Sequence, residues 1–208
     1  MLRRSVLVIA VVLMSFACGG SPTAPSDSPS GESGSTASSG PSGTLNLRIT
    51  DSPFGRAKAV LITFSEVAVL RGDTWTRVPF PDNSPTWMCD LKKLENGAND
   101  ILGSGAIPLA DYTSVRVTIQ SARVFGDFSS SSATPCARSI PAPAGAAPTT
   151  ILASREGRTS GAFQVRAGAT TIVLIDFDGE SSLTQEATGG DGSGAYFLSP
   201  VIRFLGAS

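Results

Sequence analysis

The chain has 208 residues, with 16 Lys or Arg, 17 Asp or Glu and no His, so its formal net charge is -1. A charge balance this close to zero provides no broad field to attract a phosphate backbone, and we expect no nucleic-acid partner. The absence of His removes the commonest general base, the commonest zinc ligand and the Ser-His and Cys-His nucleophile pairs. We therefore expect a protein that is not an enzyme and that needs no cofactor.

The first 17 residues have the layout of a secretory signal peptide. Arg3 and Arg4 form a basic start, residues 6–14 are apolar, and the small residue Ala17 precedes Cys18. The apolar run is about half as long as the roughly 20 residues that a membrane-spanning helix needs. The pattern therefore favours a cleaved signal over a transmembrane anchor.

The sequence Ser-Phe-Ala-Cys at 15–18 resembles the lipobox that the bacterial lipoprotein signal peptidase cuts. That resemblance implies that Cys18 becomes the first residue and carries several acyl chains, which together give a stable membrane anchor. Lipoboxes usually have Leu where this chain has Ser15, so a plain secreted protein is the alternative. Gly19 replaces the Asp that retains such proteins in the inner membrane. In a Gram-negative host this implies the outer membrane, at its periplasmic face or at the cell surface.

Residues 18–43 are predicted to form the acylated Cys and a disordered tether. Gly, Ser and Pro make up 19 of the 25 residues from 19 to 43. Such a segment has almost no apolar surface with which to offset the entropy cost of ordering. A coil of this composition and length spans roughly 25 to 30 Å. We expect it to hold a folded domain, residues 44–208, clear of the lipid head groups.

From residue 44 onward the dominant hydrophobic period is two, which is typical of half-buried strands. The alternation is regular at 45–49 and clearest at 115–125. In a strand that starts at residue 60, the apolar phase switches after Ser65-Glu66, as a β-bulge or a strand break would produce. Further strands are expected at 74–78, 149–153, 161–166, 170–178 and 196–204.

Seven to nine short strands separated by Gly, Pro and Ser clusters predict an all-β fold. The expected architecture is an antiparallel β-sandwich, immunoglobulin-like or transthyretin-like, with at most one short helix. A helical pattern occurs at 90–97, where two leucines are three residues apart and Gly97 can end the helix. Residues 126–148 are rich in Ser, Ala and Pro, and we expect a long surface loop with poor order.

An ordered set of short motifs runs through this domain. They are Asp51-Ser52-Pro53 at the end of 43–53, Asp90-Leu91 with Asn96-Gly97, Ile107-Pro108 with Tyr112, 174–178 and 196–202. In order and spacing they resemble the bacterial lipoprotein family called domain of unknown function 4382, over roughly 43–204. The family usually has Asp-Ala-Pro where this chain has Asp-Ser-Pro, and Leu-Pro-Ala-Gly-x-Tyr where it has Ile-Pro-Leu-Ala-Asp-Tyr. The resemblance implies an exported β domain with no established activity.

Cys89 and Cys136 are the two thiols that remain once Cys18 is acylated. An oxidising periplasm or cell surface would allow them to form a disulfide. The alternative is two independent thiols, with Cys89 buried beside Trp87 and Cys136 exposed. We favour the disulfide, which would also restrain the Ser- and Pro-rich loop.

Asp176, Asp178 and Glu180 alternate along the chain, so their carboxylates would share one face if the strand continued through them. With Asp51 they could supply the hard oxygen ligands that calcium prefers. Ordinary turn chemistry explains the same residues more simply, because Asp and Gly are common where a strand runs out into solvent. Calcium therefore remains the alternative and a site without metal the main interpretation.

The aromatic residues allow a second functional hypothesis. Trp75, Trp87, Tyr112, Tyr196 and the Phe residues could form a stacking platform for sugars, although a sandwich core needs most of the aromatic residues for itself. The main prediction is a membrane-anchored, non-catalytic module for binding, adhesion or envelope structure, with a polysaccharide or a protein as ligand. The alternatives are a carbohydrate-binding surface domain and a carboxylate-based hydrolase, which would need a pocket with two acids of raised pKa. The sequence leaves the oligomeric state open.

Overall fold

The chain divides into two units, residues 1–37 and residues 38–208. The computed structural model describes only part of the chain. The described residues all belong to the second unit, and they are 40–53, 55, 57–144, 150–152, 154–186 and 195–208. The predicted signal peptide, Cys18 and nearly all of the predicted tether lie outside the described residues. The first strand begins at Ser42, two residues before the predicted start of the domain.

Thirteen strands and three short helical turns form within the described residues. The strands are β1 (Ser42–Asp51), β2 (Ala59–Arg71), β3 (Thr74–Arg77), β4 (Trp87–Asp90), β5 (Asp100–Pro108), β6 (Ala110–Phe125), β7 (Cys136–Ala137), β8 (Thr150–Leu152), β9 (Glu156–Val165), β10 (Thr170–Phe177), β11 (Leu183–Glu186), β12 (Ala195–Leu198) and β13 (Ile202–Ala207). The helical turns are the 3-10 helices η1 (Pro81–Asn83) and η2 (Leu91–Lys93) and the α-helix α1 (Gly179–Ser182). Among these described elements no helix has the length and hydropathy to cross a bilayer.

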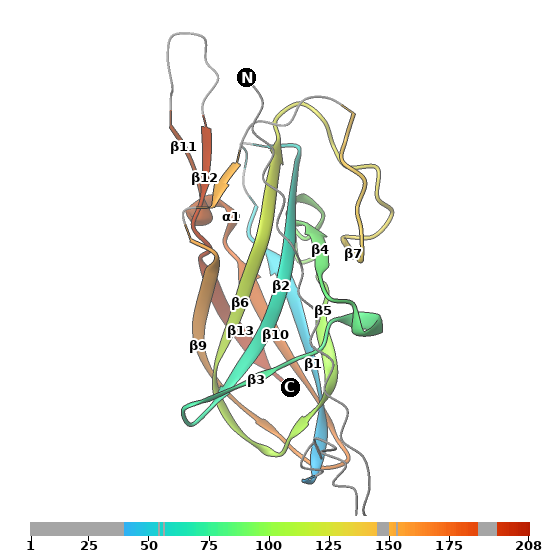
Figure 1. Cartoon of the computed structure of the whole chain (residues 1–208), viewed down its shortest axis with the longest axis vertical. Coiled ribbons are helices and arrows are strands. Elements are labelled where there is room, and N and C mark those ends of the chain that lie inside the picture. Colours follow the sequence, from blue (N-terminus) through green and yellow to red (C-terminus); the bar gives the residue numbers. More distant parts are fainter. Residues whose placement is uncertain (1–39, 54, 56, 145–149, 153, 187–194) are drawn as a thin grey trace, which may run out of the picture. The chain divides into compact units, whose positions relative to one another are not determined.

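Two main sheets lie face to face, which confirms the predicted all-β sandwich (Figure 1). We call the sheet with order β13-β10-β1-β5 sheet A and the sheet with order β7-β4-β2-β6-β9 sheet B; β3 also pairs with β2. A small third sheet has the order β11-β12-β8. Most neighbours are antiparallel, but β1 pairs with β10 and β12 with β8 in parallel. Parallel neighbours are joined by a long crossover and not by a hairpin turn, so a turn motif in the sequence cannot predict their pairing.

The main core fills the space between the two sheets. Alternate residues of β1 and β10 face it, and so do those of β2 and β6. The residues of these strands with no measurable exposure include Leu45, Leu47, Ile49, Ile62, Phe64, Val67, Val69, Val115, Val117, Val124, Val173 and Ile175. The period-two pattern therefore predicts the buried face of the sandwich correctly.

The phase switch in β2 is a β-bulge and not a strand break, which were the two explanations that the sequence allowed. The register between β2 and β6 shifts on both sides of Phe64, and the strand continues unbroken to Arg71. Because the bulge inserts one extra residue, Phe64 before it and Val67 after it both reach the core. The bulge keeps a thirteen-residue strand on one core face despite its irregular sequence.

The predicted strand 196–204 is two strands, β12 and β13, which belong to different sheets. Pro200 lies between them, and proline cannot donate a ladder hydrogen bond. The strand predicted at 161–166 starts earlier, at Glu156. The helix predicted at 90–97 is the single 3-10 turn η2, although Gly97 has the expected positive φ of 84°.

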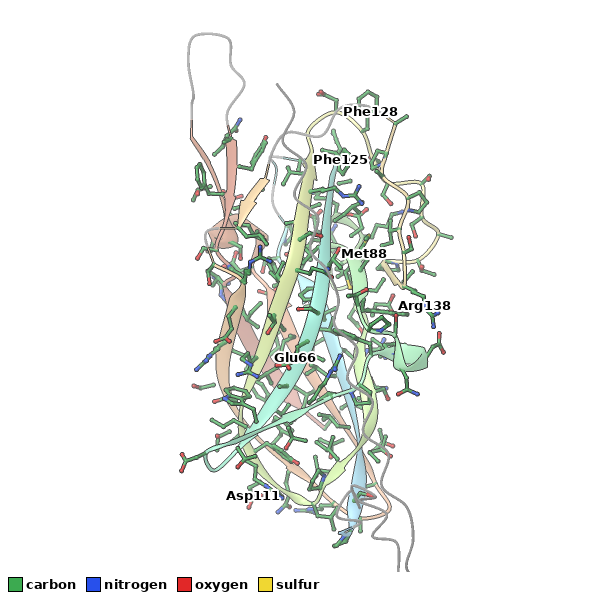
Figure 2. All side chains as sticks on the ribbon, in the orientation of Figure 1. Glu66, Met88, Asp111, Phe125, Phe128 and Arg138 are labelled. Carbon is green, nitrogen blue, oxygen red and sulfur yellow. A yellow bond between two sulfur atoms is a disulfide. The ribbon has the colours of Figure 1, made fainter. Side chains whose placement is uncertain are left out.

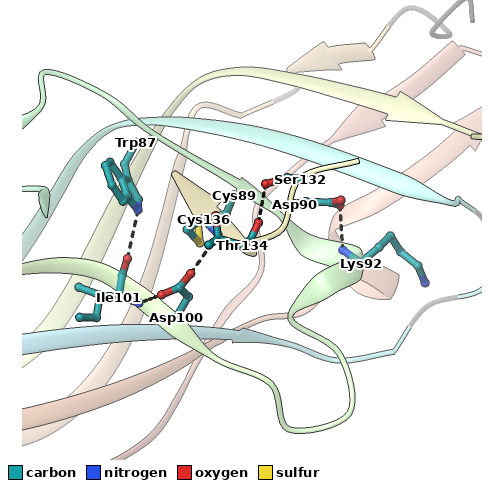
Figure 3. Close-up of a disulfide and its surroundings, with 9 residues drawn as sticks. All are labelled: Trp87, Cys89, Asp90, Lys92, Asp100, Ile101, Ser132, Thr134 and Cys136. Atoms are coloured by element: carbon teal, nitrogen blue, oxygen red, sulfur yellow. Dashed lines mark hydrogen bonds between the residues drawn. A yellow bond between two sulfur atoms is a disulfide. The ribbon is translucent and has the colours of Figure 1, made fainter. Parts of the chain in front are cut away.

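Cys89 and Cys136 form a disulfide between β4 and β7, in agreement with the favoured prediction (Figure 3). The two cysteines face each other directly in the antiparallel register, with their Cα atoms 4.1 Å apart. The Cys136 amide also donates to Asp100 Oδ2 over 3.0 Å, and the Asp90 amide donates to the Pro135 carbonyl over 2.8 Å. We name residues 126–144 the disulfide flap.

The disulfide flap follows the surface of the domain, as predicted, and is tied to it at two points; residues 145–148 lie outside the described residues. Ile140 is buried against Ala59, Leu61 and Phe125, which lie on the outer face of sheet B. The disulfide and this second apolar cluster hold a segment whose composition alone predicts a loose loop. Phe128, near the start of the disulfide flap, exposes 47% of its surface (Figure 2).

Replacing Cys89 and Cys136 together by Ala should lower the free energy of unfolding by about 4 kcal/mol, because the disulfide closes a loop with a sequence separation of 47. Urea unfolding with and without reductant measures the change. Reductant should lower the wild-type midpoint and leave that of the double variant unchanged. A double variant as stable as the oxidised wild type would contradict the prediction.

Gly161→Ala should lower the free energy of unfolding by about 1 to 3 kcal/mol through overpacking. A Cβ atom at Gly161 would lie 2.1 Å from Cγ of Phe204, whose ring stacks on Phe163. The contact joins the edge strands β9 and β13 of the two sheets. Gly126→Ala is the matched control, since nothing lies within 4 Å of its Cβ position. Equal stability of the two variants would show that this contact does not hold the edges together.

Candidate functional site

Several polar side chains meet where the parallel strands β1 and β10 end. Because the strands run in the same direction, their carboxyl ends lie at the same edge of sheet A, and Asp51 pairs in register with Phe177. Asp178 follows directly and precedes α1. We name Asp51, Ser52, Asp176 and Asp178 the acidic end of sheet A.

Asp51 occupies a core position. It continues the inward alternation of Leu47 and Ile49, and only 3% of its surface is exposed. Its Oδ1 accepts a hydrogen bond from the Gly179 amide over 3.1 Å, whereas Oδ2 has no hydrogen-bond partner among the described residues. Its own amide donates to the Leu94 carbonyl over 3.0 Å. Asp51 therefore joins β1 to α1 and to the turn after η2.

This environment keeps Asp51 protonated at neutral pH. Burial raises the pKa of its carboxyl to about 9, because a charged carboxylate loses its hydration there. The charges of Asp176 and Glu95 raise the pKa further, while the Gly179 amide and Lys92 oppose the change. A neutral acid in this position acts as a polar bridge within the core.

Asp178 has the opposite character. It is the N-cap of α1 and accepts a hydrogen bond from the Ser181 amide over 3.0 Å, and its Oδ2 also contacts the Arg203 guanidinium of β13. Burial raises the pKa of Asp178, but the hydrogen bonds from Ser181 and the charge of Arg203 outweigh this effect, and the pKa lies below its ordinary value. Asp178 is therefore a charged cap.

The four carboxylates of the calcium hypothesis do not converge on one point. The strand ends at Phe177, so the alternation that would align Asp176, Asp178 and Glu180 stops there. Asp176 Oδ2 accepts from the Ser52 hydroxyl over 2.8 Å, Asp178 turns toward Arg203, and Glu180 is exposed on α1. The described part of the chain contains no group of three or more acidic, Cys or His side chains that could hold a metal ion.

Asp90, which the sequence predicts as the start of a helix and which belongs to one of the family-like motifs, is a second buried carboxylate. It is 1% exposed, and its Oδ1 accepts from the amides of Val60 and Lys92, each over 3.2 Å. Burial is the main cause that raises its pKa. Asp90 is the N-cap of η2, and Asp is a typical capping residue at the start of a helix. This capping pattern is the feature of the sequence that could have identified Asp90 as a structural residue.

The Trp and Tyr residues of the alternative aromatic platform do not form one. Tyr112 is fully buried with its hydroxyl donating to the Pro108 carbonyl over 2.8 Å, and Trp87 and Tyr196 are also buried. Trp75 is half-buried on β3, and the Arg116 guanidinium carbon lies 4.5 Å from its ring centre. Three of the four residues therefore belong to the core, as the competing interpretation predicts.

Four cavities within the described residues have volumes of about 270, 340, 360 and 380 Å³, and none of these four is lined by two carboxylates. Asp111 is the one acidic residue in their linings. Asp51 and Asp90, whose pKa values are raised, lie in none of them. The arrangement at the acidic end of sheet A therefore fits a structural closure of the sandwich.

A two-sheet β-sandwich with buried carboxylates at one end defines the class of this domain. The family model described as Domain of unknown function (DUF4382) matches residues 42–200, and the chain belongs to that family. No curated protein and no solved structure matches the chain. The motifs at Asp51-Ser52 and 174–178, on which the resemblance in sequence rests, meet at the acidic end of sheet A.

Asp51→Asn should remove a pH dependence of stability. The folded-state pKa of about 9 lies above the ordinary value of 3.8, so the stabilising effect of the proton is complete below pH 3.8 and is lost as the pH rises toward 9. The loss is about 1.4 kcal/mol per pH unit in that window. Between pH 5 and 8 the wild type should therefore lose about 4 kcal/mol more than the variant.

Urea unfolding of both proteins at several pH values measures this difference. Asp111→Asn, which removes an exposed carboxylate from β6, is the control and should follow the wild type. Parallel stability curves for the wild type and Asp51→Asn would show that Asp51 is not protonated in the folded state.

Proposed function

We propose that the chain is an exported lipoprotein, anchored to the outer membrane through an acylated Cys18, that presents its β-sandwich as a non-catalytic module for binding, adhesion or envelope structure. The disulfide between Cys89 and Cys136 is the observation that carries the proposal of export. Disulfides form and persist in oxidising compartments such as the periplasm and the cell surface. The lipobox-like sequence at 15–18 supports the anchor.

The positions of the buried acids support a non-catalytic role. Asp51 and Asp90 are 3% and 1% exposed, so substrate cannot reach the two carboxyls whose pKa values are raised. Both accept hydrogen bonds from backbone amides and join separate elements of the sandwich. A carboxylate-based hydrolase would need two or more such acids in an open pocket.

Metabolic labelling with a palmitate analogue tests the anchor. The wild-type chain should incorporate the label and sediment with the outer-membrane fraction, whereas Cys18→Ala should lose both properties because it lacks the acceptor thiol. The double variant Cys89→Ala, Cys136→Ala is the control, which removes the other two cysteines together and should keep the label. A labelled Cys18→Ala chain, or a mature N-terminus other than Cys18 in mass spectrometry, would contradict the proposal.

A further inference from the structure

An exposed turn at residues 95–98 lies between η2 and β5. Asn96 and Gly97 at its centre have φ values of 59° and 84°, as the two central residues of a type I′ turn do. The Ala98 amide closes the turn by donating to the Glu95 carbonyl over 3.2 Å. Both central residues are exposed, and nothing lies within 4 Å of the position of a Cβ atom at Gly97. The peptide group between Asn96 and Gly97 is therefore open to solvent and has room to move.

The Gly97 amide has no hydrogen-bond partner among the described residues. Asp178 is likewise followed by a glycine, but there the Gly179 amide donates to Asp51 Oδ1 over 3.1 Å and Asp178 itself is buried. A hydrogen bond of this kind holds the amide nitrogen in place, whereas the nitrogen of Gly97 can approach the side chain that precedes it. The turn therefore places an accessible backbone nitrogen beside an exposed side-chain amide.

The three other asparagines of the chain are held more firmly. Asn46 lies within β1, which pairs with β10 on one side and with β5 on the other. The Ser84 amide, which follows Asn83, donates to a carbonyl of η1 over 3.1 Å. The side-chain amide of Asn99 is hydrogen-bonded at both ends, and the residue after it begins β5. Asn96 is the one asparagine in the sequence that glycine follows.

We infer that Asn96 is a site of spontaneous modification, at which the Gly97 amide nitrogen attacks Cγ of the Asn96 side chain. A bond forms between that nitrogen and Cγ, the bond from Cγ to Nδ2 breaks, and the proton of the nitrogen leaves with the side-chain amino group as ammonia. The resulting succinimide ring adds one water molecule and opens at either carbonyl group, which yields aspartate or isoaspartate with no change of oxidation state. Asparagine is a thermolabile residue, and glycine has no Cβ atom to crowd the attacking nitrogen. The reaction needs only water and is independent of the lipid anchor.

The same turn supports the end of β1. The Thr50 hydroxyl donates to carbonyls on both sides of the turn, that of Leu94 over 3.0 Å and that of Ala98 over 2.6 Å. The Asp51 amide donates to the Leu94 carbonyl as well, over 3.0 Å. Isoaspartate carries the backbone through its side chain, which lengthens the chain between these two carbonyls by one carbon atom. Conversion of Asn96 therefore loosens the attachment of the acidic end of sheet A.

Ageing of the detergent-solubilised full chain at mildly alkaline pH, followed by proteolysis and tandem mass spectrometry, tests the site. Asn96 should lose its side-chain amide and give two products, of which the isoaspartate is labelled by an isoaspartate-specific carboxyl methyltransferase. The other asparagines, Asn46, Asn83 and Asn99, serve as internal controls and should keep their amides. The same chain unfolded in guanidinium chloride gives the reference rate, and folded Asn96 should convert at a comparable rate because its turn leaves the attacking nitrogen accessible.

Asn96→Gly tests the effect on stability. Glycine adopts the left-handed backbone of this position at no steric cost and has no side-chain amide to lose. The midpoint of urea unfolding should fall during ageing for the wild type, in step with the fraction converted, and stay constant for Asn96→Gly. Three outcomes would overturn the inference: an intact Asn96 in the folded chain while the unfolded chain converts, conversion of Asn99 as fast as that of Asn96, or an equal change of midpoint in both proteins. The labelling of Cys18 is independent of all three.

Discussion

The parallel pairing of β1 with β10 is the constraint on which the rest of this domain depends. It runs through eight successive residue pairs, from Thr44 with Thr170 to Asp51 with Phe177, at the centre of sheet A. Because the strands run together, both deliver polar residues to one edge, where α1 and the turn after η2 complete the structure. The buried acid Asp51 and the charged cap Asp178 meet at this edge, and their environments shift their pKa values in opposite directions.

Sheet B depends on a different device. Its outer face carries apolar residues that the main core does not cover, and the disulfide flap covers them. The flap has little apolar sequence of its own, so a covalent bond and one buried isoleucine hold it where composition predicts a loose loop. The acidic end of sheet A and the outer face of sheet B are thus each completed by a short segment that is held by a few specific bonds.

The sequence predicts the fold class and the inward faces of β1, β2 and β6, because alternation reports directly on which side of a strand is buried. It gives the bulge near Phe64 as one of two alternatives. The same alternation extends to Asp51, but an acid at a core position is read as a turn residue unless the partner strand is known. The short strands β4 and β7 show no alternation of apolar and polar residues that would predict them. They are strands because β4 pairs with β2 and β7 pairs with β4. The parallel pairing joins segments more than a hundred residues apart, which no local pattern records.

The central position of β1 also determines how the domain would respond to mechanical force. Any pull on the chain ahead of Ser42 enters the fold at β1, which has β10 on one side and β5 on the other. Such a pull acts along the strand and shears both hydrogen-bond ladders at once, whereas an edge strand could be peeled away one bond at a time. A domain arranged in this way resists unfolding by a force that pulls on its first strand.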